Sequence, residues 1–155
     1  IPYQAGSFYI FDRGYNDFFR LFTIHKLGAI FIVRGKKNVK FKRISWERRL
    51  QDNVLSDSII RFAGYYQEKD YPEELRLIKY WDDENKREFI FLTNNFDLTA
   101  LEIAELYRQR WQIELFFKWM KSHLKIKHFY GTSFNAVKIK IYVAIITLFN
   151  CNHQI

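Results

Sequence analysis

The sequence contains little proline, glycine or cysteine: its 155 residues include two, six and one of these, respectively. Because it also lacks a low-complexity segment, we expect an ordered chain without extended disorder. The single cysteine, Cys151, excludes an intramolecular disulfide and fits a reducing compartment. No signal peptide is visible, and the apolar segment IYVAIITLF at residues 141–149 is too short to span a membrane.

Apolar residues and positive charge are what the sequence has in quantity. Hydrophobic residues make up 48% of the chain and aromatic residues 19%, which is enough for one compact domain with a core of its own. Lysine and arginine number 25 against 17 acidic residues, for a formal net charge of +8. The excess points to a polyanionic partner such as DNA, although many basic proteins bind no nucleic acid.

The first 34 residues are typical of a strand, a helix and a second strand. The run SFYIF, residues 7–11, ends at Asp12, and it is followed by an amphipathic segment over residues 15–26 and a buried strand over residues 29–34. A strand that ends in an acidic residue presents the carboxylate at the carboxyl edge of its sheet. Open α/β sheets bind their ligands at that edge.

From Gly35 to about Tyr80 the helical period fades, and strand-like segments alternate with charged turns. These segments are KFKRISW, IIRFAGYY and LRLIKYW, and the last is expected to pair with REFIFLT as a hairpin across residues 82–86. We interpret residues 35–96 as an inserted, mostly antiparallel β subdomain.

Helical periodicity returns over residues 98–126. Thr99 and Glu102 form a predicted capping box at the start of this helix, and a second helix is expected after Gly131 with Ser133 as its N-cap. The chain is thus predicted to be α/β, with two long C-terminal helices.

Four residues of the first long helix form the most informative pattern: Tyr107, Arg110, Glu114 and Lys121. At about 100° per residue they fall within roughly 60° of one another, so an aromatic ring, two cations and a carboxylate share one stripe. A carboxylate can ligate Mg²⁺ while the neighbouring cations hold the phosphodiester that the ion polarises.

The spacing of these four residues resembles the signature of insertion-sequence transposases of the IS4 type, a DDE branch of the RNase H-like enzymes. Three further segments are similar to that family, FDRGYNDF, FIFLTNN and FYGTSFNAV, and the resemblance extends from about Phe8 to about Ile146. It implies a partial RNase H-like core, made of residues 1–34 and 97–155 and interrupted by the β insertion.

The resemblance also assigns roles to residues. Asp12 would be the second acid of the metal-binding triad and Glu114 the third, so that both are catalytic and metal-binding. Tyr107, Arg110 and Lys121 would contact the end of a DNA strand. The implied cofactor is Mg²⁺ or Mn²⁺, with two ions in the complete enzyme.

For the parent protein the resemblance implies metal-dependent cleavage and strand transfer of DNA at the ends of an insertion element. The partners would be element-end and target DNA, bound by a homodimer in the cytoplasm of a prokaryote. No membrane partner is expected. The chain begins at Ile1 without a methionine and without the family's first aspartate or its upstream DNA-binding sequence. We therefore expect a fragment that is inactive alone.

A basic segment lies in the predicted insertion, and its role stays open. Lys36, Lys37, Lys40 and Lys42 fall within seven residues, and Lys40 and Lys42 would share one face of a strand. The segment fits contacts to DNA phosphates, and it fits equally an edge strand protected by lysines. Trp46 and Trp81 lie in the same region, and a flipped base on either one is a weaker hypothesis.

Two other functional classes remain open. A DNA-binding module without catalysis would explain the charge but not the pair Asp12 and Glu114. A nuclease or resolvase of RNase H-like fold would explain the acids but not the spacing of the helical stripe or the LTNN segment. The histidines show no spacing with the cysteine that is typical of zinc sites.

Overall fold

A computed structural model of the chain describes residues 3–123. Near the end of its last helix the description excludes six side chains, those of Ile113, Glu114, Phe117, Met120, Lys121 and His123. The chain divides into two compact units, Ile1–Gln109 and Arg110–Ile155. The fold below is that of the first unit, and the described part of the second is the latter half of a helix.

Six strands, three α-helices and one 3-10 turn are present in the described residues. In chain order they are β1 (Phe8–Phe11), η1 (Arg13–Tyr15), α1 (Phe18–Lys26), β2 (Ile30–Arg34), β3 (Phe41–Trp46), β4 (Val54–Phe62), α2 (Tyr65–Asp70), β5 (Leu75–Asp82), β6 (Arg87–Thr93) and α3 (Ala100–His123). The predicted helix after Gly131 lies outside these residues.

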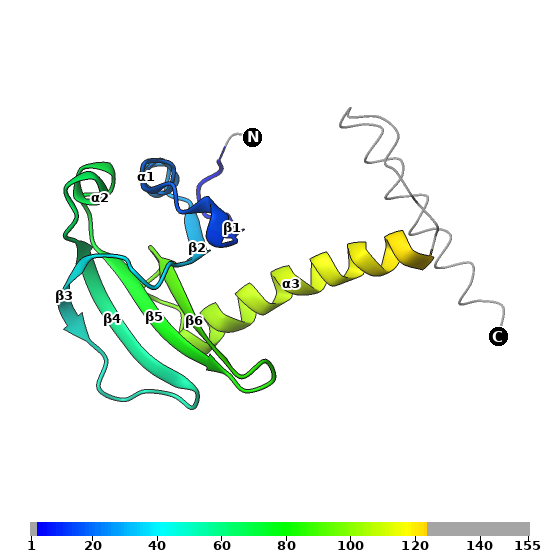
Figure 1. Cartoon of the computed structure of the whole chain (residues 1–155). Helices are drawn as coiled ribbons and strands as arrows, with labels where there is room; N and C mark the ends of the chain where they lie inside the picture. Colours follow the sequence, from blue (N-terminus) through cyan, green and yellow to red (C-terminus); the bar gives the residue numbers. More distant parts are fainter. Residues whose placement is uncertain (1–2, 124–155) are drawn as a thin grey trace. The chain divides into compact units, whose positions relative to one another are not determined.

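All six strands form one sheet in the order β1-β2-β6-β5-β4-β3 (Figure 1). β1 and β2 are parallel, with Phe8 beside Ile30, and every other neighbouring pair is antiparallel. The segment predicted as a β insertion therefore continues the sheet directly from β2. The mixed α/β class is confirmed.

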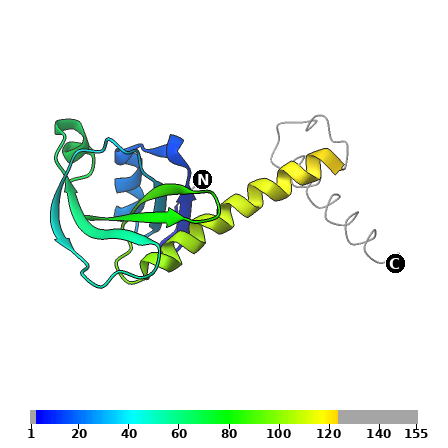
Figure 2. The same cartoon turned by 60° about the horizontal axis from the view of Figure 1, so that its bottom comes forward.

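The two faces of the sheet bury separate clusters of apolar side chains. On one face, α1 contributes Leu21 and Ile24 to a cluster that includes Phe31, Phe62 and Tyr71. On the other face, the first turns of α3 pack against the sheet (Figure 2). Their contacts are made by Ala100, Ile103, Ala104 and Tyr107, which cover Ile32, Ile78, Phe89 and Phe91. The sheet thus fixes α3 from its first turn.

The helix predicted from Tyr15 begins later, at Phe18. Asp17 is its N-cap, and the Asp17 carboxylate accepts a hydrogen bond from the Arg20 backbone N–H at 3.1 Å. Residues 13–15 form the 3-10 turn instead, closed by the Tyr15 N–H donating to the Asp12 carbonyl at 3.0 Å. Local capping by Asp17 therefore overrides the amphipathic pattern that suggested an earlier start.

The predicted strand IIRFAGYY is wrong at its second half. β4 ends at Phe62, and Gly64 becomes the N-cap of α2, where the Glu68 N–H donates to the Gly64 carbonyl at 2.8 Å. Tyr65 and Tyr66 are 78% and 77% exposed, and their rings contact each other edge to face at 5.3 Å. Aromatic residues suggested a strand here, but these two lie on a short helix at the surface.

The predicted capping box and hairpin are both confirmed. Glu102 accepts hydrogen bonds from the Thr99 backbone N–H at 2.7 Å and from its hydroxyl at 2.8 Å. These bonds, the backbone one first, lower the pKa of the Glu102 carboxyl. In the β5–β6 hairpin Asp82 pairs with Arg87, as the connection over residues 82–86 indicated. Across residues 3–123, we find no helix with the length and apolar character needed to cross a membrane.

Candidate active site

Asp12 stands where the parallel pair β1 and β2 ends. It follows β1 directly, is half-buried, and its backbone turns at once into η1. The Asn16 side chain ties this turn to β2 by donating to the Arg34 carbonyl at 3.1 Å and to the Arg13 carbonyl. The structure thus places the Asp12 carboxylate at the carboxyl edge of the sheet, where the sequence predicted it.

Tyr107 joins α3 to that edge. Its ring is 3% exposed and lies 5.0 Å from the ring of Phe91 and 5.8 Å from the ring of Phe89. The Tyr107 hydroxyl donates a hydrogen bond to Asp12 Oδ1 at 2.9 Å. We predicted a DNA contact for Tyr107, and that role stays a prediction. The apolar spacing of residues 100, 103, 104 and 107 was the signal in the sequence for its burial.

Arg110, Glu114 and Lys121 follow Tyr107 on the same helix, α3. Arg110 is half-buried, whereas the side chains of Glu114 and Lys121 lie outside the described part of the chain. The approach of Glu114 to Asp12 and the phosphate contacts of Arg110 and Lys121 remain predictions.

Polar side chains at the end of β6 and just after it fix the connection to α3 against β2. The Asn94 side chain behaves like one more strand residue: its Oδ1 accepts from the Phe31 N–H and its Nδ2 donates to the Ala29 carbonyl, both at 2.9 Å. The Thr93 hydroxyl donates to the Phe31 carbonyl at 2.6 Å, and Asn95 Oδ1 accepts from the Leu98 N–H at 2.8 Å. The side chains of the LTNN segment therefore connect the end of the sheet to the start of α3 by hydrogen bonds. The sequence did not reveal this role.

An ion pair with little solvent exposure fixes the start of α3 from another direction. The Arg76 guanidinium donates two hydrogen bonds to the Asp57 carboxylate, at 2.9 and 2.6 Å, and a third to the Leu98 carbonyl. The two side chains are only 11% and 12% exposed. Sheet and helix are thus joined two residues before α3 begins, and this constrains where Tyr107 can lie.

Two arginines stack on the ring that supports Tyr107. The guanidinium carbons of Arg34 and Arg87 lie 4.7 and 4.6 Å from the centre of the Phe89 ring. Arg34 ends β2, and because Phe11 pairs with Val33, Arg34 takes the place next to Asp12 at the end of the parallel strands. Neither arginine was predicted from the sequence to lie at this site. Positive charge and a carboxylate thus lie at one edge, as a site for phosphate and metal needs.

Comparison with known proteins decides the family. The family described as the transposase DDE domain matches residues 2–150 of the chain. The chain belongs to this family. A protein of Sinorhizobium fredii that is named as a transposase is 36% identical over 94% of the chain. Proteins named as transposases of the insertion sequences IS5377, from Geobacillus stearothermophilus, and IS4SA, from Synechocystis, are 28% and 30% identical over 87% and 88% of it.

The chain spans about two-fifths of the length of these relatives, between 36% and 42%. Within this part of a transposase DDE domain, the described residues contain no group of three histidine, cysteine or acidic side chains that could hold a metal ion. The Asp12 carboxylate has the chemistry of a single ligand, because its oxygens are hard donors, and Oδ1 accepts a hydrogen bond from the Tyr107 hydroxyl.

The basic segment of the DDE domain begins directly after β2, with Lys36 and Lys37, and reaches β3, at the opposite edge of the sheet from β1, with Lys40 and Lys42. Lys36, Lys37, Lys40 and Lys42 are all exposed, and β3 is an edge strand. Trp46, at the end of β3, is 59% exposed, while the Trp81 indole is anchored by donating to Asp83 at 3.0 Å. Edge protection and phosphate binding are both compatible with this placement, so the DNA role of the lysines stays a prediction.

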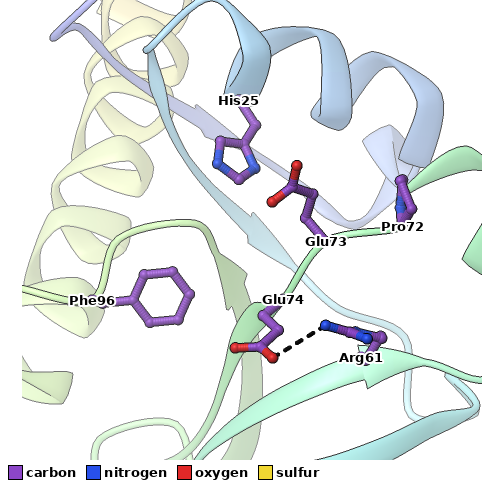
Figure 3. Close-up of a pocket in the computed structure, with 6 residues that line it drawn as sticks. All are labelled: His25, Arg61, Pro72, Glu73, Glu74 and Phe96. Atoms are coloured by element: carbon purple, nitrogen blue, oxygen red, sulfur yellow. Dashed lines mark hydrogen bonds and ion pairs between the residues drawn. The ribbon is translucent and has the colours of Figure 1, made fainter.

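The described part of the domain also contains an open pocket of about 490 Å³ (Figure 3). Its lining residues are His25, Arg61, Pro72, Glu73, Glu74 and Phe96. Arg61 pairs with Glu74 at 3.2 Å, and none of the residues predicted for catalysis lines the pocket. His25, in the pocket wall, shares a 2.6 Å hydrogen bond with the buried Tyr71, whose pKa is raised by burial and by Glu73.

Proposed function

We propose that the chain is the part of a DNA transposase that supplies two of its metal-binding carboxylates, Asp12 and Glu114. The parent protein, by which we mean the full-length protein expected to contain this chain, would cut DNA at the ends of an insertion element and join them to a target. Membership of the DDE family supports the enzyme class. The observation that carries the residue assignment is the hydrogen bond from Tyr107 to Asp12.

That bond matters because of where Glu114 stands in the sequence. Tyr107 and Glu114 are separated by about two helical turns and lie on nearly the same side of α3. This spacing, together with the family resemblance that makes Glu114 the third acid, is the basis for proposing that it serves the same metal site as Asp12. We further propose that the core is RNase H-like, and that a third acid comes from sequence of the parent outside these 155 residues.

Each residue has a role in this proposal. Asp12 and Glu114 would hold Mg²⁺ or Mn²⁺, two ions in the complete enzyme; bound metal supplies charge stabilisation for in-line displacement at phosphorus. Arg110 would hold the phosphodiester through a two-pronged contact and Lys121 through a single charge. Water would attack the phosphodiester at the element end and release the 3′-hydroxyl of the element. That hydroxyl would then attack a target phosphodiester, and the 3′-oxygen of the target strand would leave.

The partners follow from this chemistry. We propose that the parent acts as a homodimer on element-end and target DNA in the prokaryotic cytoplasm. The exposed lysines Lys36, Lys37, Lys40 and Lys42 would add contacts to DNA phosphates, so binding should weaken as salt is raised.

A strand-transfer assay on the parent protein tests the function. We expect cut element ends and joined products with Mg²⁺ or Mn²⁺, and neither with EDTA. Cutting without joining would favour a nuclease or resolvase, and DNA binding without either reaction would favour a non-catalytic module. Each of these two results would contradict the proposal.

A further inference from the structure

The hydrogen bond between Tyr107 and Asp12 assigns Tyr107 a role that differs from the DNA contact predicted for it. The Tyr107 ring is enclosed by Phe89 and Phe91, with 3% of the residue exposed. Only the hydroxyl, at the far end of the ring, has polar chemistry to offer. In the structure it meets Asp12 Oδ1 at 2.9 Å. A residue held in this way is fixed in position before any DNA arrives.

We infer that Tyr107 is a positioning residue for the metal-binding carboxylate of Asp12. A phenol hydroxyl donates one hydrogen bond, and an ionised carboxylate can accept about four. A carboxylate that accepts a bond of this kind can therefore still be a metal ligand. Hydrogen bonds to metal ligands orient them, and their loss commonly weakens metal binding by 10-fold or more. This inference rests on the proposed function, because it requires Asp12 to bind metal.

The surroundings of the two residues favour a rigid contact. The backbone at Asp12 has little freedom to move, because the turn that follows it is tied to the end of β2 by Asn16. Tyr107 cannot move far either, because Arg76 of β5 holds the Leu98 carbonyl just before its helix begins. The contact thus bridges two separately anchored elements, 95 residues apart in sequence. A carboxylate held between fixed elements loses little freedom when a metal binds.

The substitution Tyr107→Phe tests the inference, because it removes the hydroxyl and keeps the buried ring. Tyr71→Phe is the matched control. It also removes the hydroxyl of a buried tyrosine, one that is hydrogen-bonded to His25 on the other face of the sheet. Mn²⁺ binding to the parent protein, without DNA, is measured by electron paramagnetic resonance of the free ion. DNA-end binding is measured separately in EDTA by gel shift.

We expect Tyr107→Phe to weaken Mn²⁺ binding about 10-fold and to leave end binding in EDTA unchanged. Tyr71→Phe should leave both unchanged. A loss of end binding in EDTA with normal Mn²⁺ affinity would overturn the inference and make Tyr107 a DNA contact. Equal effects of both Tyr→Phe variants on Mn²⁺ binding would also overturn it, by showing a general loss of structure.

Asp12→Asn separates this inference from the proposed function. Loss of Mn²⁺ binding in Asp12→Asn, together with normal binding in Tyr107→Phe, would reject the inference alone. Normal Mn²⁺ binding in Asp12→Asn would reject the metal role of Asp12, and the proposed function with it. If Tyr107 acts through Asp12, adding Tyr107→Phe to Asp12→Asn should weaken Mn²⁺ binding no further, whereas independent additive losses would contradict the inference.

Discussion

The Tyr107 hydroxyl and the Asp12 carboxylate are joined by a 2.9 Å hydrogen bond, although the residues are 95 positions apart. Asp12 directly follows the first strand of the sheet, and Tyr107 lies in the long helix that carries Glu114. The bond connects the two segments in which the sequence predicts catalytic acids. Both residues belong to the first compact unit, so the bond fixes the strand end against the first half of the helix.

The approach of Asp12 to Glu114 gives the first prediction. In the metal-bound parent protein, their carboxyl groups should lie roughly 4 to 8 Å apart, since Mg²⁺ holds its oxygen ligands at about 2.1 Å. An experimental structure with Mn²⁺, in which anomalous scattering locates the ions, measures this distance. Carboxyl groups on opposite sides of the domain would refute the assignment of both residues.

Arg110 gives the second prediction. Replacing it with alanine in the parent should cost about 2 kcal/mol or more of end-complex or transition-state stability, because a two-pronged charged contact in a half-buried position is lost. Arg110→Lys should recover only part of this, since an ammonium lacks the planar fork. Cleavage rates and end-complex affinities, measured side by side, provide the test. Unchanged values in Arg110→Ala would show that this arginine does not hold the phosphodiester.

The pair of Arg76 and Asp57 gives a prediction about stability. Arg76→Met should lower the free energy of unfolding by about 3 to 5 kcal/mol, because it leaves the Asp57 carboxylate with little solvent and without its partner. Arg61→Met is the control: its pair with Glu74 is about half exposed and should be worth only about 0 to 1 kcal/mol. Denaturation by urea measures both. Equal losses of unfolding free energy in the two variants would mean that the burial of an ion pair does not determine the cost of breaking it.

Asn94 allows a test of how much the hydrogen bonds of the LTNN segment stabilise the fold. Asn94→Asp keeps an acceptor for the Phe31 N–H but replaces the donor that serves the Ala29 carbonyl. The unfolding free energy should fall by about 1 to 3 kcal/mol, the cost of an unsatisfied group in a half-buried place. Asn38→Asp, at an exposed turn, should change it by less than about 0.5 kcal/mol. An unchanged unfolding free energy in Asn94→Asp would show that these hydrogen bonds add no stability.

Local patterns predicted the strand end at Asp12 and the start of α3. An apolar run that stops at an acid, and a Thr99–Glu102 box before an apolar face, are signals contained in a few residues. α2 escaped prediction because its tyrosines suggested a strand, while its one local marker, Gly64 as N-cap, is weak without a capping side chain. Aromatic residues indicate burial only where they pack against a core, and the two tyrosines of α2 are exposed.

Contacts between distant residues could not be predicted in the same way. We predicted a DNA contact for Tyr107 and not its burial, although the apolar spacing of residues 100, 103, 104 and 107 was a local signal for that burial. The partner of Tyr107, Asp12, depends on the order of the strands and on which edge α3 reaches, and neither is encoded nearby. The roles of Asn94 and Arg76 are likewise set by the β2–β6 and β4–β5 registers.

Nicking of element-end DNA, run in parallel with gel shifts across a Mg²⁺ and salt series, tests the central claim most directly. In the parent protein, Asp12→Asn and Glu114→Gln should keep end binding and abolish nicking, because each amide preserves shape and removes the charge that holds the metal. The 155-residue chain should bind DNA weakly and with steep salt dependence, and cut nothing. Metal-dependent nicking by the isolated chain, or by either amide variant of the parent, would contradict the account.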